Sequence, residues 1–328
     1  MSVLVTGGAG YIGSHAVIDL SAAGEEVIVL DDLSTGFDWA VQVPDNLYIG
    51  DIADGALVGR IIAERNVEAV VHFAGSVVVP ESVADPLKYY LNNTAKSRSL
   101  IEICVKGGVR HFIFSSTAAV YGMTGEAAVS EDMPLNPMSP YGASKLMTEW
   151  MLRDTAAAHD LTYVALRYFN VAGGDPQGRI GQSTANATHL IKVACQTALG
   201  QRPYIEVFGE DYPTKDGTCI RDYIHVSDLA AAHTSALTYL RNGGASLVAN
   251  CGYGHGFSVR EVLRSVERAA GREIEIRRAP RRPGDPASVV SNPARLKATL
   301  GWAPNYDDLD TIVSHALAWE MKLRERNR

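Results

Sequence analysis

The chain has 328 residues, and its 30 Lys and Arg against 37 Asp and Glu give a formal net charge of −7. This length predicts one large domain with a smaller companion, and the mildly acidic balance argues against nucleic acid or an anionic membrane as a partner. The four cysteines show no C-x-x-C spacing, so we expect no metal site and a reducing, cytoplasmic compartment. Strand-like residues begin at Val3, which leaves no room for a signal peptide, and no apolar run reaches membrane-spanning length.

Short β-branched runs alternate with longer amphipathic stretches through the first half of the chain. This pattern is typical of an α/β fold with a doubly wound parallel sheet. After Asn170 the regularity fails, and we expect a smaller α/β domain that binds the substrate. The predicted domains are therefore 1–170 and, mainly, 171–328, with about 220–250 returning to the first. The predicted strands are 2–6, 26–31, 47–49, 69–73, 111–115 and 162–167, with 223–228 returning to the sheet edge, and the predicted helices are 12–23, 55–65, 86–106, 141–159, 259–270 and 309–326.

A glycine-rich turn joins the first predicted strand to the first helix, in the pattern Gly7-x-x-Gly10-x-x-Gly13. Such a turn lets backbone N–H groups approach a pyrophosphate at a helix N-terminus, as in a Rossmann sheet. Asp31 ends the second strand 18 residues after Gly13, where a carboxylate accepts hydrogen bonds from the adenosine ribose. Because that carboxylate would repel a 2′-phosphate, the sequence predicts NAD rather than NADP as the cofactor.

The next strand ends also carry residues that we expect to frame the adenine and the phosphates of NAD, because the carboxyl ends of parallel strands share one edge of the sheet. These residues are Asp51, Ile52, Phe73, Ala74 and Gly75.

A tyrosine and a lysine one helical turn apart indicate hydride chemistry at a hydroxyl group. Tyr141 and Lys145 follow Pro140, which suits a helix start, and the strand before them ends in Ser115-Ser116-Thr117. Lowering the pKa of a phenol by about 3 units requires roughly 4 kcal/mol, which the Lys145 ammonium and a positive nicotinamide can supply. Tyr141 would then take a hydroxyl proton as a hydride leaves the adjacent carbon, with Thr117 or Ser116 bonded to the same oxygen.

These motifs resemble the extended short-chain dehydrogenase/reductase family and, within it, the UDP-glucose 4-epimerase branch. The resemblance runs nearly end to end. It is carried by TGGAGYIGSH at 6–15, HFAG at 72–75, FSSTAAVYG at 114–122, RYFN at 167–170 and RDYIHV at 221–226.

The resemblance implies an isomerase that interconverts UDP-galactose and UDP-glucose by reversible hydride transfer at C4, with NAD retained as a bound group, and it implies a homodimer. It assigns Tyr141 as the base, Lys145 as its tuning partner and Thr117 with Ser116 as contacts of the reacting oxygen. The residues expected at NAD are Gly7, Gly10, Tyr11, Ile12, Gly13, Asp31, Asp51, Ile52, Phe73, Ala74, Gly75, Asn92, Ser115, Tyr141, Lys145 and Tyr168. Those expected at the UDP-sugar are Thr117, Tyr141, Asn170, Asn186, Phe208, Arg221, Arg282 and Asp285.

The sequence departs from the family pattern at two positions. Val77 stands where many members carry a Lys near the cofactor phosphates, so NAD would lose one contact. Val289 replaces a bulky aromatic found in some members, which predicts a pocket roomy enough for a 2-N-acetyl group.

Three rival functions remain at this stage. A 4-epimerase of UDP-pentoses or UDP-uronates would carry the same motifs. A sugar-nucleotide dehydratase is disfavoured because Ala118-Ala119 follows Thr117, where such enzymes usually place Asp-Glu. A noncatalytic NAD-binding protein would have no need of Thr117, Tyr141 and Lys145.

Overall fold

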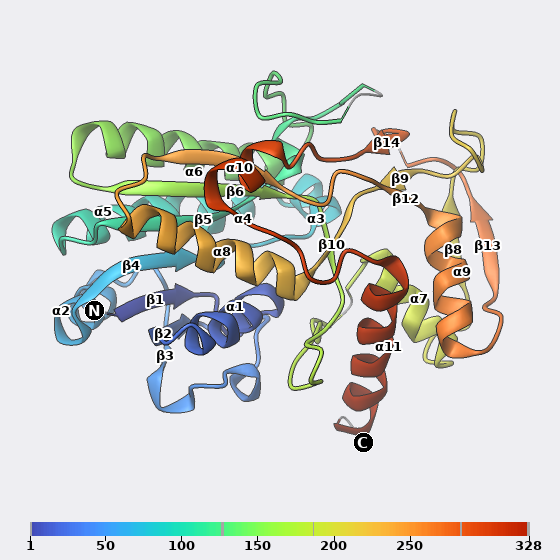
Figure 1. The fold of residues 1–328 in the computed structure, drawn as a ribbon, viewed down its shortest axis with the longest axis horizontal. Coiled ribbons are helices and arrows are strands. Elements are labelled where there is room, and N and C mark those ends of the chain that lie inside the picture. The colour runs from blue at the N-terminus through green and yellow to red at the C-terminus, as the bar shows by residue number, and fades with distance from the viewer. Residues whose placement is uncertain (1, 126–127, 186, 283, 327–328) are drawn as a thin grey trace.

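A computed structural model describes residues 2–125, 128–185, 187–282 and 284–326. Its centre is a seven-stranded, entirely parallel sheet in the order β11-β6-β5-β4-β1-β2-β3, with helices on both faces (Figure 1). This confirms the predicted doubly wound α/β fold. The strands are β1 (Ser2–Thr6), β2 (Glu26–Asp31), β3 (Leu47–Ile49), β4 (Val67–His72), β5 (His111–Thr117), β6 (Thr162–Tyr168) and β11 (Leu247–Cys251).

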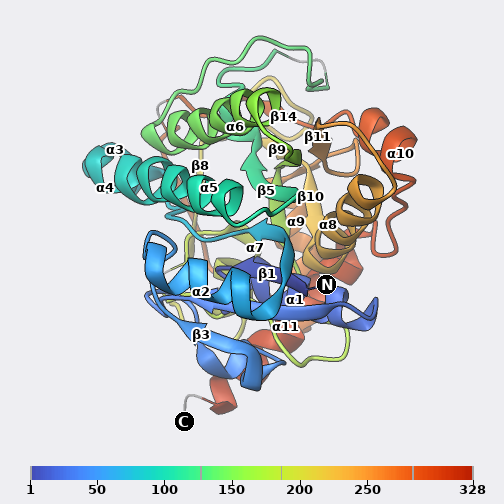
Figure 2. The same cartoon turned by 90° about the vertical axis from the view of Figure 1, so that its left-hand side faces the viewer.

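Successive side chains along each strand point to opposite faces of the sheet and pack into two separate hydrophobic cores. Val3 and Val5 of β1 point into the core shared with α1 (Tyr11–Ala22) and α8 (Val226–Arg241), whereas Leu4 points into the core on the opposite face. Because both faces are covered, the central residues of the strands are mainly apolar on both sides of the sheet rather than alternately apolar and polar. Figure 2 shows the second cover, formed by α2 (Gly55–Arg65), α5 (Lys96–Lys106) and α6 (Pro140–Ala158).

The predicted helix 86–106 is three consecutive helical pieces. It consists of α4 (Pro86–Tyr89), a π-helical turn over Tyr90–Ala95 and α5, and the short α3 (Val79–Ala84) precedes it. A π turn inserts an extra residue into a helix and is often found at functional sites. Periodicity alone gives no warning of such a turn, because the flanking residues keep helical spacing.

The second half of the chain contributes small sheets at the end of the molecule where the parallel strands finish (Figure 1). The strands are β7 (Asn170–Ala172) with β10 (Tyr223–His225), β8 (Ile205–Phe208) with β13 (Ile276–Ala279), and β9 (Ile220–Arg221) between β12 (Phe257–Ser258) and β14 (Ser288–Val289). The helices there are α7 (Leu190–Ala198), α9 (Val259–Ala270), α10 (Ala294–Leu300) and α11 (Leu309–Arg326).

The prediction that 223–228 returns to the main sheet is wrong. Tyr223–His225 pairs with β7 in a separate two-stranded sheet, and α8 begins directly after it at Val226. The strand that completes the main sheet is β11, which pairs in parallel with β6. The sequence analysis missed it because β11, LVANC, is interrupted by Asn250, a polar residue whose amide is satisfied by Val129 and Tyr121.

Candidate active site

The turn between β1 and α1 has no space for side chains. Gly7 adopts φ +72°, and a Cβ on it would lie 2.6 Å from the backbone nitrogen of Ala74. A Cβ on Gly13 would lie 2.1 Å from the carbonyl oxygen of Gly7. Gly10 is the N-cap residue of α1 and has no side chain that could cap the helix. The backbone N–H groups at the start of α1, including those of Tyr11 and Ile12, therefore face the glycine-rich turn. This cradle fits the pyrophosphate of a dinucleotide.

Asp31 lies beside this turn and braces it. Its two carboxylate oxygens accept hydrogen bonds from the backbone N–H groups of Ala9 and Leu33, both at 2.9 Å. Burial raises the pKa of the carboxyl group, and these two backbone hydrogen bonds oppose that effect. Since each oxygen retains a second lone pair, the placement is compatible with the predicted ribose contact.

The other strand ends lie at the same edge. The N–H groups of Phe73 and Ala74 both donate to the carbonyl of Thr6, which holds the end of β4 against the glycine turn. Asp51 forms an ion pair with Lys96 at 2.6 Å, so its negative charge is partly neutralised. The adjacent Ile52 is buried in the hydrophobic core under α2. The structure therefore brings the predicted NAD residues of β1, β2 and β4 together.

The π-helical turn supplies a support for Gly75 that the sequence analysis missed. The Asn93 side chain accepts a hydrogen bond from the N–H of Ser76 at 2.7 Å and donates to the carbonyl of Ser76 at 2.9 Å. The predicted NAD residue Asn92, next to it, donates to the Ser76 hydroxyl. In the sequence, the available signal was that Asn93 stands between two polar residues inside an amphipathic helix. In the structure, its side chain is buried.

Tyr141 and Lys145 lie in the first turns of α6, at the carboxyl end of β5. Pro140 starts the helix, and the hydroxyl of the N-cap residue Ser139 accepts a hydrogen bond from the N–H of Gly142. The side chain of Thr117 lies close enough to the Tyr141 phenol to lower its pKa, and the Lys145 ammonium donates to the carbonyl of Ser115 at 2.9 Å. The three predicted reacting residues are therefore close to one another.

Burial controls the ionisation of both residues in the protein without ligands. It raises the pKa of Tyr141, which the nearby Thr117 side chain partly offsets, and it lowers the pKa of Lys145 to about 8. Without a bound nicotinamide, the surroundings of Tyr141 do not bring the pKa of the phenol down, and the expected joint effect of Lys145 and a positive nicotinamide stays a prediction. Both groups are removed from water, and the free-energy cost of burying their charged forms exceeds the stabilisation that neighbouring groups supply.

The buried ammonium of Lys145 makes stability depend on pH. Below pH 8 both folded and unfolded states hold the proton, and the folded state bears the full cost of burying the charge. Between pH 8 and the ordinary pKa of 10.5, the unfolded state binds more protons, so stability rises with pH. We expect the stability of the native chain relative to Lys145→Met to improve by about 2 to 3 kcal/mol from pH 7 to pH 10 without NAD. Urea unfolding at the two pH values measures this, and a constant difference would contradict it.

Ser116 does not lie where the sequence analysis expected it. Its hydroxyl donates to the Glu149 carboxylate, which also forms a buried ion pair with Arg167 at 2.6 Å. Side chains alternate along a strand, so Ser116 turns away from the side that carries Ser115 and Thr117. The expected contact between Ser116 and the reacting oxygen is therefore replaced by a structural one, and Thr117 alone of this pair meets Tyr141.

Three of the predicted NAD residues join the parts of the site. Ser115 and Tyr168 share a hydrogen bond between their hydroxyl groups across the neighbouring strands β5 and β6. Tyr11 donates from its phenol to the carbonyl of Gly173 at 2.8 Å, which ties the first turn of α1 to the second half of the chain.

The residues expected at the UDP moiety gather on the small sheets. The Arg282 guanidinium lies 3.8 Å from the centre of the Phe208 ring. Arg221 forms an ion pair with Asp285 and donates to the carbonyl of Pro286 at 2.8 Å. Two arginines beside an aromatic face and a carboxylate suit a diphosphate, a base and a ribose.

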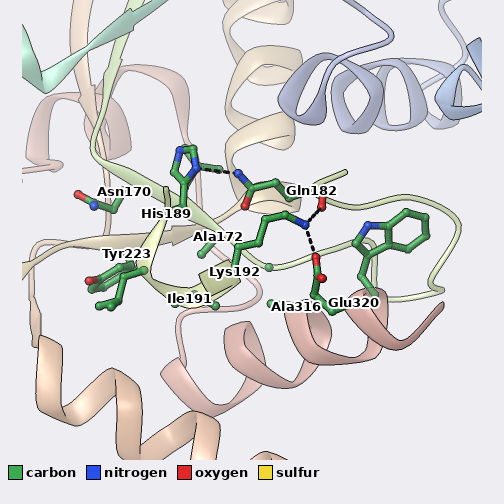
Figure 3. Close-up of a pocket in the computed structure, with 13 residues that line it drawn as sticks. Asn170, Ala172, Gln182, His189, Ile191, Lys192, Tyr223, Ala316 and Glu320 are labelled. Atoms are coloured by element: carbon green, nitrogen blue, oxygen red, sulfur yellow. Dashed lines mark hydrogen bonds and ion pairs between the residues drawn. The ribbon is translucent and has the colours of Figure 1, made fainter. Parts of the chain in front are cut away.

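Asn170 begins β7 and lines a small pocket between β7, α7 and α11 (Figure 3). Asn186 lies outside the described residues. Of the two departures from the family pattern, Val77 is half exposed, and Val289 packs against the cluster of Val120, Tyr121 and Leu146. Ala118, the residue after Thr117, packs on the same cluster.

Comparisons with known proteins agree with this geometry. Residues 3–252 match the NAD dependent epimerase/dehydratase family. A UDP-glucose 4-epimerase of Azospirillum brasilense is 56% identical over 98% of this chain and 93% of its own length. The crystal structure of UDP-glucose 4-epimerase from Brucella ovis in complex with NAD superposes with a TM-score of 0.94 at 44% identity, covering 96% of this chain and 97% of that one. The UDP-Glc/GlcNAc 4-epimerase from Campylobacter jejuni gives 0.86 at 45% identity, covering 98% and 99%.

These matches span nearly the whole chain and include both halves of the site, which confirms the resemblance predicted from the motifs. The chain belongs to the NAD dependent epimerase/dehydratase family and, within it, to the UDP-glucose 4-epimerases.

Proposed function

We propose that the protein interconverts UDP-galactose and UDP-glucose by inverting C4 of the hexose with bound NAD. The observation that carries this is the meeting of Tyr141, Lys145 and Thr117 at the edge of the sheet that also holds the glycine cradle. The family membership supports the same reaction and cofactor.

The side chains divide the reaction among them. The glycine turn, Asp31 and Lys145 would hold NAD, which would supply a reversible hydride acceptor for C4 and a positive ring that favours the phenolate of Tyr141. The Tyr141 phenolate receives the C4 hydroxyl proton as the hydride leaves. It gives that proton back after the 4-keto sugar has rotated and the hydride has returned to the opposite face, so atoms and charge balance without added reductant. The hydroxyl of Thr117 accepts a hydrogen bond from the N–H of Ala119 at 3.1 Å, which leaves its own proton available for Tyr141 or the sugar oxygen.

Residues 1–170 would hold NAD and 171–328 would mainly hold the UDP-sugar. The segment 220–250 supports a discontinuous boundary, because α8 and β11 pack in the first half of the molecule. The cysteines are all free and buried, which supports our proposal of a reducing, cytoplasmic location; they are Cys104, Cys195, Cys219 and Cys251. Among the described residues, no helix is long and apolar enough to cross a membrane.

The direct test is incubation of the purified protein with separate UDP-sugars, without added NAD, while inversion at C4 is followed by NMR. Conversion of UDP-galactose to UDP-glucose is the expected result. Inversion of UDP-pentoses or UDP-uronates alone would replace the proposed substrate, and loss of water from the sugar would indicate a dehydratase instead.

UDP-N-acetylhexosamines are a second substrate class favoured by Val289. The side chain is small and packs on the same cluster as Ala118, which follows Thr117, so we infer that a larger ring at this position would narrow the space beside the reacting residues. The similarity to a UDP-Glc/GlcNAc 4-epimerase supports the same substrate range.

Enlarging Val289 should separate the two substrate classes. We expect Val289→Tyr to lower kcat/KM for UDP-N-acetylgalactosamine about tenfold or more while the value for UDP-galactose stays near that of the native chain, because overpacking costs about 1 to 3 kcal/mol. Val289→Ala is the matched control and should keep both activities. Equal losses for both sugars in Val289→Tyr would show that Val289 does not face the 2-substituent.

The partner that we propose is a second copy of the chain, docked on an exposed apolar surface. This surface comprises Val83, Leu87, Leu91 and Trp150, whose exposed fractions are 65%, 77%, 55% and 45%. They lie on α3, α4, the π turn and α6, next to a groove lined by Met147 and Met151. Adjoining apolar side chains of this size mark an interface, and two-fold pairing of one face is the commonest way to cover it.

Placing charge on this surface should dissociate the dimer. We expect Leu87→Asp with Leu91→Asp to halve the mass measured by light scattering at micromolar concentration, because two buried carboxylates would lack partners. Ile49→Asp, at a residue 65% exposed on β3, is the control and should leave the mass unchanged. A native chain that is already monomeric would refute the proposed partner.

A further inference from the structure

The C-terminal helix α11 touches a loop beside the proposed NAD site. Trp319 is buried, and its ring centre lies 6.1 Å from that of Trp39, which in turn lies 5.1 Å from Phe37. The N–H of Phe37 donates to the carbonyl of Ala9 at 3.0 Å, in the glycine turn. We call Gly36–Trp39 the cofactor loop. Its aromatic residues connect the glycine turn to α11.

Trp319 also supports a second loop. A Cβ on Gly181 would lie 2.3 Å from the indole ring, so the backbone of Gly181 lies directly on that ring. The indole N–H donates to the hydroxyl of Ser183 at 3.3 Å. We call Gly181–Ser183 the substrate loop, because Gln182 lines the same pocket as Asn170, which is expected at the UDP-sugar.

The next residue of α11, Glu320, holds the same loop through Lys192. Glu320 forms a buried ion pair with Lys192 of α7, and the Lys192 ammonium also donates to the carbonyl of Gln182 at 2.6 Å (Figure 3). A buried ion pair stabilises a fold little compared with apolar residues of the same volume. Its directional bonds do, however, hold the backbone of Gln182 in one place.

Both binding sites adjoin this arrangement. Asn170, expected at the sugar nucleotide, lines the same pocket as Lys192, Trp319 and Glu320 (Figure 3). Gly173, which accepts the hydrogen bond from Tyr11 of the cofactor site, lines it as well. The indole of Trp319 is therefore the shared support of two loops that serve different ligands.

We propose that Trp319 and Glu320 are positioning residues that fasten the substrate loop to the cofactor loop, so that each loop keeps its place through the other. This inference rests on the proposed function for the identity of the two ligands. Its physical consequence is a cross-effect. A change in the cofactor loop alters binding of the UDP-sugar, and a change in the substrate loop alters retention of NAD.

Two variants, each on one loop, test the cross-effect. Trp39→Leu removes the ring that Trp319 contacts from the cofactor side, and Gly181→Ala drives a methyl group into the indole from the substrate side. We expect Trp39→Leu to raise KM for UDP-galactose about fivefold with kcat nearly unchanged, the size of a lost contact worth about 1 kcal/mol. We expect Gly181→Ala to speed the loss of NAD from the purified protein, followed on a desalting column, by a similar factor.

Met321→Ala is the matched control, because Met321 lies on α11 next to Glu320 but is half exposed. It should change neither KM nor NAD loss. An unchanged KM in Trp39→Leu together with unchanged NAD loss in Gly181→Ala would overturn the proposal, as would equal effects in Met321→Ala.

Hydrogen exchange separates failure of this inference from failure of the proposed function. Backbone amide exchange at Gln182 and Ser183 should accelerate in Trp39→Leu, whatever sugar the protein uses and whether or not it epimerises one. Absence of C4 inversion in the native chain with faster exchange in the variant would refute the function and keep the coupling. Inversion with unchanged exchange would refute the coupling and keep the function.

Discussion

Replacement of Tyr141 by Phe is expected to lower kcat for C4 inversion by about three orders of magnitude, the middle of the range for removing a general base. The variant keeps the buried ring and loses the oxygen that lies beside Thr117. We expect KM and the content of bound NAD to change little, because the ring continues to fill the same space. Initial rates followed by NMR, with NAD measured after denaturation, test both parts.

The matched control for this variant is Tyr163→Phe. Tyr163 is as buried as Tyr141, but it lies near the amino end of β6, away from the edge that carries the site. It should retain nearly full activity. A Tyr141→Phe variant within tenfold of the native rate would contradict the assignment of Tyr141 as the base.

The largest expected loss of stability follows from breaking the buried pair of Glu149 and Arg167. Glu149 accepts two hydrogen bonds from Arg167 and one from Ser116, and both charged side chains are about 4% exposed. Glu149→Leu would leave the guanidinium buried without its partner, which costs about 3 to 5 kcal/mol. Urea unfolding of the variant and the native chain measures this difference.

Two further variants distinguish the broken pair from a general effect of losing a glutamate. Glu102→Leu removes a carboxylate that pairs on the helix surface with Arg98 and Lys106, and it should change stability little because water screens those charges. Glu149→Leu combined with Arg167→Met should recover most of the loss, since no unpaired charge remains. A double variant as unstable as Glu149→Leu alone would show that packing, rather than charge, is what the site requires.

Most of the sheet could be predicted from the sequence because each strand has a strong local pattern. Runs such as Val27–Leu30 and Phe112–Phe114 are apolar at every position, as expected for strands covered on both faces. The glycine turn and the start of α6 were equally clear, since Gly7, Gly13 and Pro140 act through backbone geometry that depends little on distant residues.

The missed features depend on partners far away in the chain. β11 joins the sheet through β6, and its polar Asn250 is satisfied by residues more than a hundred positions earlier. In the sequence, Ser116 and Thr117 look equivalent. The sequence does not reveal that Glu149 and Arg167 lie on the face of the strand to which Ser116 points. On the substrate side, Arg221 and Asp285 were expected at the UDP-sugar through the family resemblance alone, and their ion pair with each other was not predicted.

The position of β11 has a consequence for synthesis of the chain on the ribosome. About 80 residues separate the end of β6 from the start of β11, so one edge of β6 stays unpaired for roughly 4 to 16 s at ordinary rates of translation. An unpaired, apolar edge strand is a template for association with other chains. Nascent chains that stall before Leu247 would therefore be the species most prone to aggregate, and slow codons between β6 and β11 would lower the yield of native protein.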